Sequence, residues 1–140
     1  METGKGLHGL WLTSAQIGNS LFDEPGSKKV GELVEKAKKN NVELVFPVDY
    51  VTADKFAKDA QVGSATDAEG IPDGWMGLDA GPKSQALFQE TIKSAKTILW
   101  NGPAGVFEFE NFAKGSKAML DACLEAEKAG TTVIVGGGDT

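Results

Sequence analysis

Apolar residues recur every three or four positions in three parts of the chain, which is the pattern of a helix with one buried face. These parts are residues 27–39, 83–95 and 111–129. Their apolar positions are Val30, Leu33, Val34 and Ala37; Leu87, Phe88, Ile92 and Ala95 on one face; and Phe112, Ala118, Met119, Ala122, Cys123 and Ala126 on an inner side. Asn40 and Asn41 tolerate the left-handed backbone that ends the first helix. We therefore expect three amphipathic helices.

Short apolar runs rich in β-branched and aromatic residues alternate with these helices. They cover residues 42–50, 97–100 and 131–135, and such runs are typical of buried strands. A further short strand or turn is indicated at 75–78, and a short helix is one interpretation of 54–60.

Strand, helix, strand, helix, strand is the order of an α/β fold, here a partial Rossmann-like parallel sheet with helices packed on it. Residues 1–16 show no periodicity, and we expect them to be irregular. Ligands of such sheets bind beyond the carboxyl ends of the strands. Two of the predicted strands end in glycine-rich loops, at 101–105 and 136–138. This coincidence predicts a binding site at that edge of the sheet.

Composition narrows the class of protein. A chain of 140 residues has the size of one domain, and a net charge of −6 argues against nucleic acid or an anionic membrane as the partner. No apolar stretch is long enough to cross a membrane. Cys123 is the single cysteine, which fits a reducing, cytoplasmic location, and we expect it to be a packed apolar residue. His8 is the single histidine, so a zinc site or a Ser-His-Asp triad is not expected.

Candidate chemistry gathers in the two glycine-rich loops. The run Gly136–Gly138 lets backbone N–H groups approach a phosphate, and it is followed by the carboxylate of Asp139, suited to Mg²⁺, and the hydroxyl of Thr140. A plain glycine turn is the alternative. In the second loop, the carboxylate of Glu108 could accept hydrogen bonds from ribose hydroxyls. The alternative is that Glu108 lies in the first turn of a helix, where the helix dipole favours a negative charge. Residues 75–78 have two interpretations: they form a frame around an adenine, or they belong to the hydrophobic core. The residues alone predict an α/β domain that binds a phosphorylated ligand.

Longer motifs carry a resemblance to a known family. They are Ile17-Gly18 followed by SLFDEPG, FPVDYVTADKF, GIPDGWMGLDAGP, ILWNGPAGVFEFENFAKGSKA and VIVGGGDT. In this order they resemble the C-terminal nucleotide-binding domain of the phosphoglycerate kinase family. In that family the C-terminal domain binds MgATP or MgADP, and the N-terminal domain binds 3-phosphoglycerate or 1,3-bisphosphoglycerate. Closure of the two domains then allows direct phosphoryl transfer.

The resemblance also implies roles for individual residues. Gly77 would lie against the adenine and Glu108 would contact the ribose. Asn101, Gly102, Ala104 and Phe107 would line the nucleotide cleft. Asp139 would serve the Mg²⁺ ion, and Thr140 with Gly137 and Gly138 would hold the phosphates.

The sequence also departs from the family, and these departures limit the activity that we expect of this chain. Residues 1–16 do not resemble the family, so we expect 17–140 to be a partial nucleotide-binding domain. The Gly-Ala-Lys segment with its phosphate-binding lysines, the N-terminal domain and the later Gly-rich serine loop do not occur in this sequence. Without an acceptor site and basic clamp we expect no catalytic residue here and negligible kinase activity from this chain alone. The alternatives are a non-catalytic nucleotide-binding module and a degenerate chain that depends on a partner.

Overall fold

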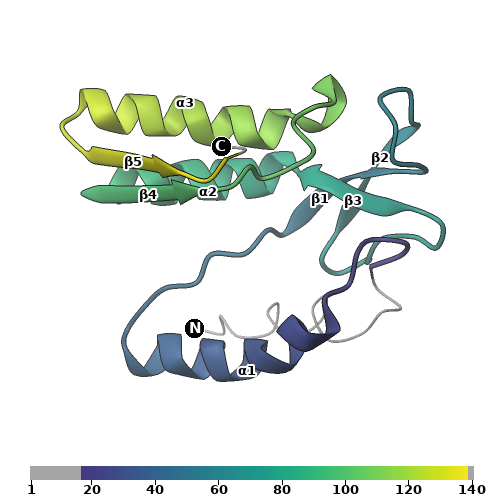
Figure 1. The fold of residues 1–140 in the computed structure, drawn as a ribbon, viewed down its shortest axis with the longest axis horizontal. Coiled ribbons are helices and arrows are strands. Elements are labelled where there is room, and N and C mark those ends of the chain that lie inside the picture. Colours follow the sequence, from purple (N-terminus) through teal and green to yellow (C-terminus); the bar gives the residue numbers. More distant parts are fainter. Residues whose placement is uncertain (1–16, 139–140) are drawn as a thin grey trace.

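Two small sheets and three α-helices make up the computed structural model, which describes residues 17–138 (Figure 1). The elements in order are α1 (Glu24–Lys39), β1 (Asp49–Ala53), β2 (Val62–Thr66), β3 (Met76–Ala80), α2 (Pro82–Ser94), β4 (Thr97–Asn101), the 3₁₀-helix η2 (Glu110–Phe112), α3 (Lys114–Lys128) and β5 (Thr132–Gly136). Strands β2, β1 and β3 form an antiparallel sheet in that spatial order. Strands β4 and β5 form a parallel pair.

Helices α2 and α3 pack against each other and link the two sheets. Helix α2 also contacts β1, while α3 contacts β3 and β5 (Figure 1). The expected α/β class, with helices packed on a sheet that includes parallel strands, is confirmed. Among the described helices none is long and apolar enough to cross a membrane.

The strand expected at 42–50 is wrong for most of its length. Only Asp49 and Tyr50 lie in a strand, and they open β1 of the antiparallel sheet. Pro47 cannot donate a ladder hydrogen bond, and no described strand pairs with residues 42–48. The parallel sheet in the described part of the chain therefore has two strands, not the three that the pattern predicts.

Three further expectations need correction. Residues 54–60 form bends and turns instead of a helix. The helix expected at 111–129 is broken at Ala113, which separates η2 from α3. Strand β2 was not predicted, because its sequence VGSAT buries only Ala65 and therefore shows no apolar alternation. The strand or turn indicated at 75–78 is β3.

Helix α1 begins earlier than its apolar pattern predicts. Oδ1 of Asp23 accepts a hydrogen bond from the Gly26 amide at 3.0 Å, and this capping starts the helix at Glu24. Asn41 has a φ of 54°, which confirms the left-handed end. No residue of α1 is buried, and the helix lies apart from the other elements (Figure 1).

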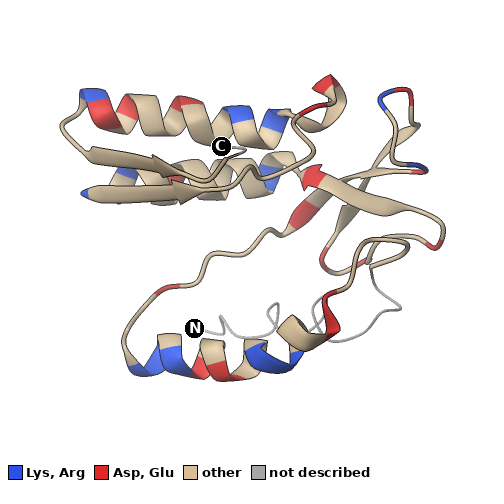
Figure 2. Ribbon diagram, in the orientation of Figure 1, with Lys and Arg blue, Asp and Glu red and all other residues tan. Residues whose placement is uncertain are grey.

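The described core centres on Phe112, which is fully buried with Ala53, Ala60 and Leu78 around it. Cys123 is buried on α3, as expected for a packing residue. Strands β4 and β5 contain no charged residue (Figure 2). One of their faces is uncovered, since Leu99 is 71% exposed and its register partner Ile134 is 50% exposed.

Candidate functional site

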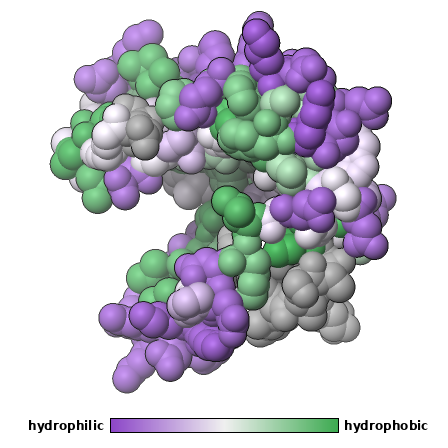
Figure 3. All heavy atoms as spheres, turned by 45° about the vertical axis from the view of Figure 1, so that its right-hand side comes forward, coloured by the Kyte–Doolittle hydropathy of each residue, from purple (hydrophilic) through white to green (hydrophobic). Residues whose placement is uncertain are grey.

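A pocket of about 940 Å³ opens between α1 and the body of the molecule. Figure 3 shows the molecule hollowed there, with hydrophobic residues along the hollow. Gly77, Gly102 and Ala104 all line this pocket, although β3 and the loop after β4 are separated in sequence by α2. The structure thus brings three of the expected nucleotide residues to one pocket.

Gly77 owes its place to an irregularity of the antiparallel sheet. Asp79 pairs with Val51 while Gly77 pairs with Thr52, so Leu78 falls between two ladder pairs. The Gly77 amide donates to the Ser20 hydroxyl at 2.9 Å. A Cβ at Gly77 would come within 2.9 Å of Cδ1 of Ile71. A larger residue at this position would therefore displace the pocket wall.

Of the four residues read as a frame for adenine, Gly77 and Leu78 line the pocket. Trp75 does not line it. Its ring lies against Gly63 of β2, where an added Cβ would come within 2.9 Å of the indole. Trp75 thus serves the packing of the sheet, in keeping with the core alternative.

The loop between β4 and η2 is anchored at several points. The Val106 amide donates to the carbonyl of Leu78 at 2.9 Å. The Ala104 amide donates to the Ser116 hydroxyl of α3 at 3.0 Å. Nε1 of Trp100 donates to the carbonyl of Gly102 at 2.6 Å, and Gly102 has a φ of 98° that favours glycine. The loop is therefore held from β3, β4 and α3 together.

The carboxyl ends of β4 and β5 meet at the same edge. Asn101 and Gly136 are register partners at the end of the parallel pair. Gly137 follows with a φ of 94°, and Gly138 is exposed. Asn101, Gly137 and Gly138 therefore gather at one edge, as expected. Asp139 and Thr140 lie outside the described residues.

Phe107 and Glu108 are not part of the large pocket. Phe107 is 41% exposed. Glu108 borders a separate hollow of about 430 Å³ together with Lys58 and Asp59. The structure thus brings Glu108 beside the 54–61 segment and not beside Gly77.

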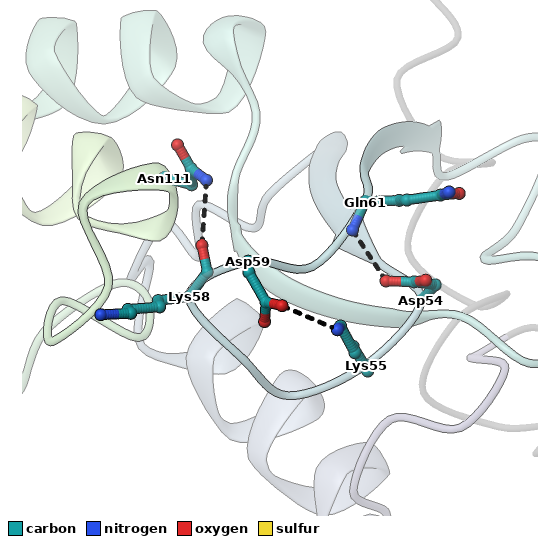
Figure 4. Close-up of polar contacts among 6 residues, drawn as sticks. All are labelled: Asp54, Lys55, Lys58, Asp59, Gln61 and Asn111. Carbon is teal, nitrogen blue, oxygen red and sulfur yellow. Dashed lines mark hydrogen bonds and ion pairs between the residues drawn. The ribbon is translucent and has the colours of Figure 1, made fainter.

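Polar contacts hold the 54–61 segment together and join it to η2 (Figure 4). Asp54 accepts from the Gln61 amide at 2.8 Å, and Lys55 pairs with Asp59 at 3.1 Å (Figure 4). Nδ2 of Asn111 donates to the Lys58 carbonyl at 3.4 Å, and the rings of Phe56 and Phe109 have centroids 5.3 Å apart. Of these residues, Lys58, Asp59, Phe109 and Asn111 line the smaller hollow.

No lysine or arginine is among the described residues that line the large pocket. The acidic ones are Asp23 and Asp79. The described part of the site therefore has largely apolar walls with a few hydroxyl side chains, and its lining has no basic side chain for a triphosphate.

Two buried carboxylates were missed by the sequence reasoning. Asp49 accepts from the amides of Lys83 at 3.0 Å and Ser84 at 2.7 Å, at the start of α2. Asp79 accepts from the Gly115 amide at 2.7 Å, at the start of α3. Both helices begin at residues without a capping side chain of their own, Gly81 and Ala113. A charged residue inside an apolar run is the signal that could have marked them.

The pKa values of the two carboxylates are shifted in opposite directions. Burial raises the pKa of Asp49, but hydrogen bonds from the Ser84 hydroxyl and from the amides of Ser84 and Lys83 outweigh it, so this pKa lies below its usual value. For Asp79 burial outweighs the backbone hydrogen bonds, and the pKa lies above its usual value.

Comparison with known proteins gives one consistent result. The sequence profile of the phosphoglycerate kinase family matches residues 9–140. The match includes part of the 1–16 segment. The phosphoglycerate kinase of Yarrowia lipolytica is 74% identical over 129 residues, which are 92% of this chain and 31% of the relative. That of Schizosaccharomyces pombe is 70% identical over the same share.

Solved structures agree. The phosphoglycerate kinase of Coxiella burnetii superposes with a TM-score of 0.82 at 34% identity, over 89% of this chain and 31% of that protein. The enzyme of Pyrococcus horikoshii gives a TM-score of 0.59 at 20% identity, a likeness of fold. The chain spans about a third of the length of these relatives. With a profile match over nearly its whole length, the chain belongs to the phosphoglycerate kinase family.

Proposed function

We propose that this chain supplies part of the nucleotide site of a phosphoglycerate kinase and binds MgADP or MgATP. The whole enzyme would transfer a phosphoryl group between ATP and 3-phosphoglycerate in glycolysis. The observation that carries the proposal is that Gly77, Gly102 and Ala104 line the same pocket. Its volume of about 940 Å³ falls in the range of small-ligand sites.

The residue roles are those that the family resemblance implies, and the position of Gly77, Gly102 and Ala104 in this pocket supports them. Gly77, with no side chain, lets the flat adenine approach β3. Gly102 and Ala104 would line the nucleotide cleft in the same pocket, and Asn101 and Phe107, at the two ends of their loop, would complete it. Glu108 would contact the ribose, although it borders the smaller hollow.

The phosphate end would lie at the edge where β4 and β5 finish. Gly137 and Gly138 would offer backbone N–H groups to the phosphates, with the Thr140 hydroxyl beyond them. Mg²⁺ takes oxygen ligands, and the carboxylate of Asp139 follows Gly138 directly. When bound, the metal would neutralise phosphate charge.

The chain alone would have negligible kinase activity. Phosphoryl transfer depends on positioning and on stabilising the transferred charge, and the described pocket lining carries no basic side chain. The acceptor, 3-phosphoglycerate, would be bound by the N-terminal domain of the whole enzyme. We place the protein in the cytoplasm, where a single buried thiol such as Cys123 stays reduced.

Complementation tests this proposal. The chain is mixed with a polypeptide that carries the remaining segments of the Yarrowia lipolytica relative, and phosphoryl transfer from ATP to 3-phosphoglycerate is followed in a coupled assay. We expect activity from the mixture and none from either part. Nucleotide binding without recovered activity would favour the non-catalytic module, and loss of both would favour the degenerate chain.

A further inference from the structure

The carboxylate of Asp79 lies where three segments meet: β3, the loop after β4 and the start of α3. Its Oδ1 accepts from the Ala80 amide at 2.8 Å, and its Oδ2 accepts from the Gly115 amide at 2.7 Å. Asp79 is only 4% exposed. The side chain therefore ties the first turn of α3 to the strand that carries Gly77.

Two glycines leave room for this carboxylate. A Cβ built on Gly105 would collide with Oδ1 of Asp79 and would lie 2.6 Å from the Phe112 carbonyl oxygen. A Cβ on Gly115 would collide with the same carboxylate. The backbone at Gly105 thus lies directly against Asp79, and the position of one fixes the position of the other.

The same loop is held by the two elements that Asp79 joins. Val106 donates to the Leu78 carbonyl on β3, and Ala104 donates to the Ser116 hydroxyl on α3. If α3 shifts relative to β3, the hydrogen bonds of Val106 and Ala104 cannot both keep their geometry unless the loop changes its shape. The arrangement of the loop therefore depends on the contact between Asp79 and Gly115.

We propose that Asp79 is a positioning residue for the loop Gly102–Phe107, which it holds in place at the pocket that Gly77 also lines, through its contacts with Gly115 and Gly105. The inference rests on the proposed function, because it makes Asp79 a determinant of nucleotide affinity. The competing interpretation is that Asp79 only caps α3 and contributes to stability alone.

Asp49 provides a matched control. It is also buried, and it caps α2 through the Lys83 and Ser84 amides as Asp79 caps α3. The glycine it crowds is Gly81, at the start of α2 and outside the loop. Asp49→Asn therefore perturbs a helix start without touching the loop.

The test is calorimetric titration of the whole chain with MgADP, at a temperature where each variant is folded. We expect Asp79→Asn to raise Kd by about tenfold, the size expected for loss of a hydrogen bond to a charged group, and Asp49→Asn to leave Kd unchanged. Gly105→Ala keeps the carboxylate but crowds it, and it should weaken binding similarly. If Asp79→Asn does not fold, the affinity of Gly105→Ala for MgADP tests the proposal in its place. Unchanged affinity in the folded loop variants, or equal losses in Asp79→Asn and Asp49→Asn, would overturn the proposal.

A second readout needs no nucleotide. Amide hydrogen exchange at Ala104 and Val106 should be faster in Asp79→Asn than in the parent chain. If Asp79→Asn does not fold, the same increase is expected in Gly105→Ala. In Asp49→Asn the exchange rates at these amides should equal those of the parent chain. If the parent chain fails to bind MgADP, the proposed function fails, while this exchange measurement still tests the positioning role. Equal exchange at these amides in the parent chain and the folded loop variants would refute that role.

Discussion

The hydroxyl of Ser84 lies 2.6 Å from Oδ1 of Asp49, 35 residues earlier in the chain, and donates a hydrogen bond to it. Ser84 is fully buried, and its oxygen also accepts from the Val48 amide at 2.9 Å. This pair joins the start of β1 to the first turn of α2. One serine thus bonds to both the backbone and the side chain at the start of β1.

Ser84→Ala should lower the free energy of unfolding by about 1–3 kcal/mol, because the Val48 amide and the Asp49 carboxylate each lose a buried partner. Ser94→Ala is the control, since Ser94 ends the same helix but is exposed and bonds only to Thr91. Urea denaturation followed by circular dichroism measures both. Equal midpoints for the two variants would contradict the assigned role of Ser84.

The two buried carboxylates should respond to pH in opposite directions. The pKa of Asp49 is lowered by folding, so its contribution to stability is present above about pH 4 and is lost as pH falls through the folded value. The pKa of Asp79 is raised by folding, so its contribution is present below about pH 4 and is lost as pH rises through the folded value.

Melting temperatures measured between about pH 3 and pH 6 test this. The advantage of the parent chain over Asp49→Asn should grow as pH rises, and its advantage over Asp79→Asn should shrink. Parallel curves for the two variants would show that the environments of the carboxylates do not differ as described.

Truncation of Phe112 should be far more costly than truncation of Phe107. Phe112 is fully buried, and Phe112→Ala should cost about 3–5 kcal/mol, enough to unfold a chain of marginal stability. Phe107 is 41% exposed, so Phe107→Ala should reduce stability much less. Thermal unfolding compares them, and a Phe107→Ala loss as large as that of Phe112→Ala would place Phe107 in the core instead.

The uncovered face of β4 and β5 should make the isolated chain associate with itself. Leu99 and Ile134 are register partners there and are both largely exposed, and exposed apolar strand surfaces promote association. Sedimentation equilibrium should show oligomers that Leu99→Lys reduces. Leu124→Lys, at an exposed leucine of α3, should leave them. A monomeric parent chain would contradict this prediction.

Local sequence patterns predicted the helices well. Three amphipathic stripes gave α1, α2 and most of α3, and Asn41 and Gly130 end helices with positive φ values. The two predicted strands that precede glycine-rich loops, β4 and β5, are also confirmed. They pair in parallel, so that their carboxyl ends lie at the same edge. These features depend on residues that are close in sequence, where periodicity and turn chemistry are informative.

Long-range features could not be predicted in the same way. Segment 42–48 has the composition of a strand, but a strand needs a partner, and no described strand pairs with it. The caps of α2 and α3 come from Asp49 and Asp79, more than thirty residues away. Motifs that identify the family predicted site residues, yet the separation of Glu108 from the large pocket became visible only in three dimensions.

A residue-resolved titration with MgADP tests the central claim most directly. Amide resonances of the isotope-labelled chain are followed as the nucleotide is added, with magnesium alone as the control. We predict saturable shifts at Gly77, Gly102 and Ala104, and at Gly137 and Gly138 beyond β5. Absence of saturable shifts, or shifts confined to surfaces away from these residues, would contradict the assignment of this pocket as the nucleotide site.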